Sequence, residues 1–164
     1  MATLGRGFVD VVKRRRIDIA VIIAWSVAVA LLIINTYNNF YAESILLSYH
    51  KIAYLPYEGP TFTGVDLLLL AAISFFAGIV LTDVKSIIYG FFANIFLSFT
   101  LASAYVFTYI WFVLEYERSL SQIAFGWEDA AFLAMVNVFR FVFPMGILFC
   151  FLGITIGIFI RGLR

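Results

Sequence analysis

The sequence predicts an all-α integral membrane protein: a compact bundle of four transmembrane helices with both termini in the cytoplasm. Three observations predict this class. The 164 residues are 64% hydrophobic and only 13% charged, whereas about a quarter of the residues in soluble domains are charged. Four apolar segments reach or exceed the roughly 18 residues that a spanning helix needs. Basic residues gather on one side of these segments, and their position sets the orientation of a bundle.

The four spans are expected at 19–37, 63–82, 87–114 and 130–160, within a single membrane domain that covers residues 1–164. The first apolar run is too long for the core of a signal peptide, and no small-residue cleavage site follows it. We therefore expect it to remain in the membrane. Four helices of about 20 residues use half of the chain, which leaves nothing for a soluble catalytic domain.

The basic residues predict the orientation of the bundle. Eight of the 11 Lys and Arg residues flank the spans on one side. They are Arg6, Lys13, Arg14, Arg15, Arg16, Lys85, Arg161 and Arg164. Lys and Arg beside spans are retained in the cytoplasm, so both termini are expected there, with the protein in the cell membrane. The short link at 82–86 predicts that the second and third spans are antiparallel neighbours.

The first outer loop, residues 38–62, carries apolar residues at helical spacing. They are Tyr41, Ile45, Tyr49 and Ile52. Spacings of three and four residues are typical of an amphipathic helix that lies in the membrane interface. Pro56, Gly59 and Pro60 would end this helix and redirect the chain into the second span. A short hairpin is the alternative for this loop.

Small residues mark the faces through which membrane helices pack, because lipid is as apolar as leucine and helices associate by close approach and hydrogen bonding. The expected packing residues are Gly78, Gly90, Asn94, Ser98, Gly146, Gly153 and Gly157. Gly153 and Gly157 form a GxxxG motif that fits either internal packing or a homodimer face. Asn94 and Ser98 fit interhelical hydrogen bonding or, alternatively, the lining of a polar path.

Several chemistries lack the residues they require. The single cysteine, Cys150, excludes an intrachain disulfide or a CxxC redox pair, and the single histidine, His50, excludes a bis-histidine haem in the bundle. No cluster has metal-ligand spacing, and no phosphate-binding glycine loop or HExxH motif occurs. We expect no cofactor, no metal, no nucleic-acid partner and no enzymatic activity.

Arg140, in the stretch "VNVFRFVFPMG", is the charge that most needs an explanation. Counting back the roughly 20 residues of a span from Arg161 places the outer membrane boundary near Arg140. The candidate outer polar site consists of Arg140, Asp66, Asn137, Tyr105 and Tyr109. Within it we expect an ion pair between Arg140 and Asp66. This pair either only stabilises the bundle, or an anionic group of a ligand competes with Asp66 for Arg140.

Two functions follow as hypotheses from this pattern. The first is a non-catalytic subunit or scaffold of a membrane complex, which is favoured because the middle of each span is uncharged and no catalytic constellation is present. Its partners would be the lipid bilayer and a membrane protein. The alternative is a small oligomeric transporter or channel, a homo-oligomer with a polar site at the outer leaflet.

Overall fold

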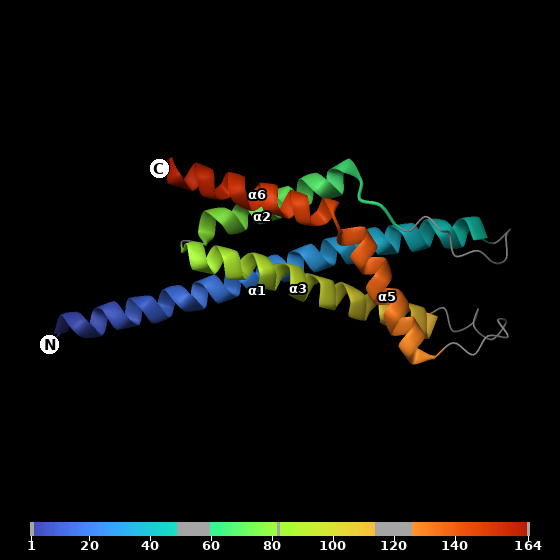
Figure 1. Ribbon diagram of the computed structural model, residues 1–164, viewed down its shortest axis with the longest axis horizontal. Coiled ribbons are helices and arrows are strands. Elements are labelled where there is room, and N and C mark those ends of the chain that lie inside the picture. Colours follow the sequence, from blue (N-terminus) through green and yellow to red (C-terminus); the bar gives the residue numbers. More distant parts are fainter. Residues whose placement is uncertain (1, 49–59, 82, 114–125, 164) are drawn as a thin grey trace.

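The computed structural model describes residues 2–48, 60–81, 83–113 and 126–163, and the regular structure in these segments is helical. The helices are α1 (Ala2–Ser48), α2 (Gly64–Val80), α3 (Val84–Thr108), the π-helical turn η1 (Tyr109–Val113), α5 (Trp127–Val142) and α6 (Met145–Gly162) (Figure 1). Among these described residues, three stretches are long and apolar enough to cross a membrane: Arg15–Phe40, Val84–Phe112 and Met145–Gly162. Helix α2 is apolar and, at 17 residues, slightly shorter. The protein is an α-helical membrane protein.

The distribution of side chains is that of a membrane bundle. Large apolar side chains cover the outside of the helices, as at Phe92, Phe96 and Phe132. The buried polar and charged side chains are Asp18, Ser26, Thr36, Ser74, Asn94, Ser98 and Ser103. Lipid solvates the apolar exterior, and polar groups are stabilised only where another helix offers a partner.

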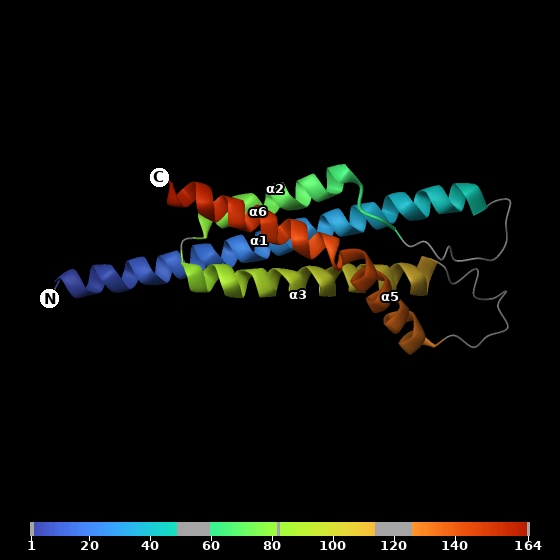
Figure 2. The ribbon, with the colours of Figure 1, turned by 45° about the horizontal axis from the view of Figure 1, so that its top comes forward.

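The helices are arranged as two pairs, in which α1 packs on α3 and α2 packs on α6. The two helices of each pair run in the same direction, and the pairs run in opposite directions (Figures 1 and 2). The short link predicted that the second and third helices pack as neighbours. They do run antiparallel, but α2 packs chiefly on α6, because the glycines of these two helices face each other.

Helix α1 differs from the expected span at 19–37. It is a single helix of 47 residues, about 70 Å long at 1.5 Å per residue. No Gly or Pro lies between Tyr37 and Ser48 to end it. The separate interfacial helix predicted for the first outer loop is therefore wrong up to Ser48, as is the hairpin alternative, and residues 49–59 lie outside the described part.

The expected span at 130–160 is two helices rather than one. Helix α5 ends at Val142, Phe143 takes an extended backbone conformation, and α6 begins at Met145. Pro144 causes the break, since it has no N–H to donate and disfavours helical geometry in the residue before it. Helix α5 crosses the bundle obliquely (Figure 2), and only α6, about 27 Å long, is aligned with α2.

Candidate functional site

The residues predicted to form an outer polar site do not form an Arg140–Asp66 pair. The Asp66 carboxylate accepts hydrogen bonds from the Thr63 backbone N–H at 2.9 Å and from the Thr63 hydroxyl at 2.7 Å. The Asp66 N–H donates in return to the Thr63 hydroxyl. This capping box satisfies backbone N–H groups at the start of α2. The Asp66 carboxylate is therefore hydrogen-bonded within its own helix end and not to Arg140. Arg140 is exposed in the last turn of α5 and has no ion pair with any described residue.

The other predicted members of that site lie on separate elements. The Tyr105 hydroxyl on α3 donates to Asn38 Oδ1 on α1 at 2.7 Å. Tyr109 begins the π-helical turn, and Asn137 lies half-buried on α5. Asp66 and Tyr105 thus have other partners, and no hydrogen bond within the described part joins Arg140 to the other four residues.

Two hydrogen bonds connect α1 to α3, one near each end of the pair. Near the termini, the Ser86 hydroxyl donates to Asp18 Oδ2 at 2.8 Å, and at the far end is the Tyr105 to Asn38 bond. The two bonds are about 20 residues apart along each helix, or about 30 Å. This separation is close to the thickness of the hydrocarbon core of a bilayer.

Helices α2 and α6 approach each other through glycines. The seven predicted packing residues are all buried. A Cβ added at Gly78 would lie 2.5 Å from the backbone oxygen of Ile154, and one at Gly153 or Gly157 would meet the backbone oxygen of Ala71 or Phe75. The GxxxG motif is therefore occupied within the chain. At the C-terminal end of this pair, the Arg161 guanidinium donates to the backbone oxygen of Leu81.

A line of polar side chains crosses the middle of the bundle, and we call Trp25, Ser74, Cys150 and Asn94 the midplane polar cluster. Trp25 Nε1 on α1 donates to the Ser74 hydroxyl on α2 at 3.1 Å. Cys150 on α6 is also buried. Asn94 on α3 is only 1% exposed, and its Oδ1 atom has no hydrogen-bond partner. Each of four helices thus contributes one side chain.

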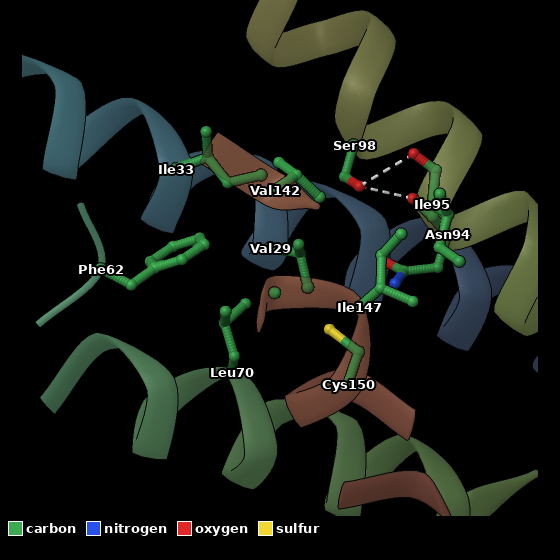
Figure 3. Close-up of a pocket in the computed structure, with 11 residues that line it drawn as sticks. Val29, Ile33, Phe62, Leu70, Asn94, Ile95, Ser98, Val142, Ile147 and Cys150 are labelled. Carbon is green, nitrogen blue, oxygen red and sulfur yellow. Dashed lines mark hydrogen bonds between the residues drawn. The ribbon is translucent and has the colours of Figure 1, made fainter. Parts of the chain in front are cut away.

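Asn94 and Cys150 border a small cavity between the two helix pairs (Figure 3). The cavity volume is about 10 Å³. Its lining also includes Ser98, whose hydroxyl donates to the backbone oxygen of Asn94 at 2.6 Å. The remaining lining residues are apolar or glycine: Val29, Ile33, Phe62, Leu70, Ile95, Val142, Gly146 and Ile147.

The cavity lies in the middle of the helix bundle, far from the ends of α3 and α6. Cys150 precedes Arg161 by 11 residues, or about 16 Å, and Asn94 follows Ser86 by 8 residues, or about 12 Å. The midpoint of a hydrocarbon core of about 30 Å lies about 15 Å from either boundary. A polar side chain at this depth has no water layer nearby and depends on its protein surroundings.

The pairing of Trp25 with Ser74 was not predicted from the sequence. A tryptophan inside an apolar span is itself a signal, because a buried indole N–H usually has a hydrogen-bond partner. The partner, Ser74, comes from another helix, so the pair requires knowledge of how the helices pack. Within the described segments, no group of three or more His, Cys, Asp or Glu could hold a metal ion, and His50 lies outside them.

The geometry therefore defines an α-helical membrane protein with a polar cluster at mid-depth. The chain matches no protein-family model, no curated protein and no solved structure.

Proposed function

We propose that the protein is a four-span bundle of the cell membrane, with both termini in the cytoplasm, and that it acts as a non-catalytic subunit of a membrane complex. The fourth span of this proposal is α2. Its 17 residues extend about 25 Å, and it packs along α6, which has 18 residues. A helix of this length can cross the bilayer with modest local thinning.

The arrangement of the ends supports the proposed orientation. Both termini and the link between α2 and α3 lie at the same end of the molecule (Figures 1 and 2). Lys85 and Arg161 are at this end, as are the basic residues at 13–16 of α1. Clustering of Lys and Arg on one side of a bundle favours the cytoplasm for that side.

The observation that carries the subunit proposal is an aromatic face on α3. Tyr89, Phe92 and Phe96 follow one another at spacings of three and four residues, so they lie on one side of the helix. Their side chains are 73%, 66% and 70% exposed. Aromatic residues are enriched in the cores of protein interfaces. We propose that a transmembrane helix of a different polypeptide packs on this face.

Photo-crosslinking in cells tests this proposal. A photoreactive phenylalanine analogue is placed at Phe92 or Phe96, and a matched control carries it at Leu152, which is 50% exposed on α6. We expect both α3 positions to form an adduct with a second, heterologous polypeptide, and the control position to form none. Identification by mass spectrometry then names the partner.

Two outcomes of the same experiment contradict the subunit proposal. Adducts with lipid alone at both α3 positions would mean that the aromatic face is covered by the bilayer. Adducts of twice the mass of the chain would show a homo-oligomer. The second result, combined with solute flux in liposomes that contain only this protein, would establish the small oligomeric transporter instead.

A further inference from the structure

The small cavity that Asn94 and Cys150 border contains a polar atom whose hydrogen bonding is incomplete. Asn94 Oδ1 is buried and accepts no hydrogen bond from the described protein groups. Its amide points from α3 toward the space that Ile147 and Cys150 of α6 border (Figure 3). A buried acceptor without a donor is destabilising, and no bulk water reaches the centre of a bilayer to relieve it.

The size and lining of the cavity identify a ligand that can satisfy this acceptor. A volume of about 10 Å³ holds roughly one water molecule. A buried water needs two to four polar partners, and three side chains of the lining can supply them. Asn94 Oδ1 accepts, the Ser98 hydroxyl oxygen has a free lone pair because its own hydrogen goes to the Asn94 backbone oxygen, and the Cys150 thiol donates.

We propose that one water molecule is bound in this cavity, between the Cys150 thiol and the side chains of Asn94 and Ser98. The thiol donates to the water, and the water donates to Asn94 Oδ1 and to the Ser98 hydroxyl oxygen. The water therefore supplies the donor that Asn94 Oδ1 lacks.

The consequence of this water is a second polar link between the two helix pairs. Trp25 and Asn94 belong to the α1–α3 pair, and Ser74 and Cys150 to the α2–α6 pair. The Trp25–Ser74 hydrogen bond already joins α1 to α2. With the water, Cys150 on α6 is also joined to Asn94 and Ser98 on α3. This inference does not depend on the subunit proposal.

The single cysteine makes the site directly observable. Because Cys150 is the one cysteine of the chain, the infrared S–H stretching band of the purified protein reports on this thiol alone. Two variants remove the water in different ways. Asn94→Leu deletes its main acceptor, and Ser98→Val fills its space with a methyl group while Asn94 and Cys150 are kept.

We expect the S–H band to shift to higher frequency in both variants, because the thiol loses its acceptor. The milder Ser98→Ala, which removes one of three partners and adds no volume, should shift the band less and in the same direction. If Ser98→Val does not fold, Ser98→Ala still tests whether a water is bound at the thiol. Ser26→Ala is the control, since Ser26 is buried on α1, bonds to the Ile22 backbone oxygen and lies outside the cavity lining; its band should not move.

Two results would overturn the proposal. An S–H band that stays in place in all three cavity variants would mean that the thiol donates to no water there. A band that shifts in Asn94→Leu but not in either Ser98 variant would mean that Cys150 bonds directly to Asn94, with no water between them.

Discussion

The two helix pairs are held together by different physical means. Helices α2 and α6 approach so closely that glycines of one helix lie against backbone atoms of the other, at Gly78, Gly153 and Gly157. Helices α1 and α3 contact each other through side chains, with the Asp18–Ser86 and Asn38–Tyr105 hydrogen bonds at the two ends. The α2–α6 interface is therefore rigid, and its stability depends on the volume of the residues in it. The α1–α3 interface can adjust, and its stability depends on polar contacts.

The comparison shows that a glycine in a membrane helix does not always have the same role. Gly90 also lies in an interface, between α3 and α1, but a Cβ added there would meet the side chain of Ile22 at 3.0 Å rather than backbone. A flexible side chain can move by a few tenths of an ångström, whereas a backbone oxygen can move only with its helix. A Gly→Ala substitution should therefore change the stability of the protein differently at the two interfaces.

The largest effect is expected for Gly153→Ala in the α2–α6 pair. The new methyl group would overlap the backbone oxygen of Ala71, so the helices must separate. Overpacking of this kind costs about 1–3 kcal/mol and occasionally more, which outweighs the helix propensity gain of about 1 kcal/mol. The measurement is the free energy of unfolding in detergent.

Gly162→Ala is the matched control for this substitution. It lies at the end of the same helix, and an added Cβ would meet no atom within 4 Å. Its stability should stay within about 0.5 kcal/mol of the parent protein. Equal stability of Gly153→Ala and Gly162→Ala would contradict the close approach of α2 and α6.

A smaller effect is expected for Ser86→Ala in the α1–α3 pair. Asp18 is 8% exposed, and the substitution removes the hydroxyl that donates to its carboxylate. Loss of a hydrogen bond to a charged group costs about 1.5–3 kcal/mol when both partners are buried; since Ser86 is half-buried, we expect about 1 kcal/mol.

A double-mutant cycle isolates this contact from other effects. Asp18→Ala and Ser86→Ala are measured singly and together, and the coupling energy should be at least about 0.5 kcal/mol. Strictly additive losses of stability would mean that the two side chains do not interact. The Asp18–Ser86 hydrogen bond between α1 and α3 would then be absent.

The smallest effect is expected for Gly90→Ala. The methyl group displaces the Ile22 side chain slightly, and the gain in helix propensity of about 1 kcal/mol offsets that cost. Stability in detergent should change by no more than about 0.5 kcal/mol in either direction. A loss as large as that of Gly153→Ala would show that the α1–α3 interface is as rigid as the other one, and the contrast between the pairs would disappear.

The sequence predicts the positions of the helices better than it predicts which helices pack together. Apolar runs identify where α2 and α3 lie, because a span must be apolar whatever surrounds it, whereas the run at 130–160 is divided between α5 and α6. Pro144 lies in the predicted fourth span, and its effect on the helix follows from its chemistry. The choice of α6 rather than α3 as the main neighbour of α2 depends on how glycine surfaces fit together in space. A short link between two helices constrains their direction but does not create a matching face.

The predicted outer site shows the same limit for polar residues. Asp66 satisfies its carboxylate within one turn of its own helix, at Thr63, and local partners of this kind prevail over a distant arginine because they require no ordering of a long side chain. Trp25 and Asn94 instead depend on other helices. Their environment at mid-depth follows from their positions in the spans, but their partners do not.

The most direct test of the account is whether the two pairs cross the membrane in opposite directions. In a Cys150→Ser background, Lys85→Cys and Glu128→Cys place single thiols at exposed positions at the start of α3 and of α5. An impermeant maleimide added to intact cells should label Glu128→Cys at once and Lys85→Cys only after permeabilisation. Labelling of both positions from the same side would contradict a spanning α3, and labelling of Lys85→Cys alone would reverse the proposed orientation.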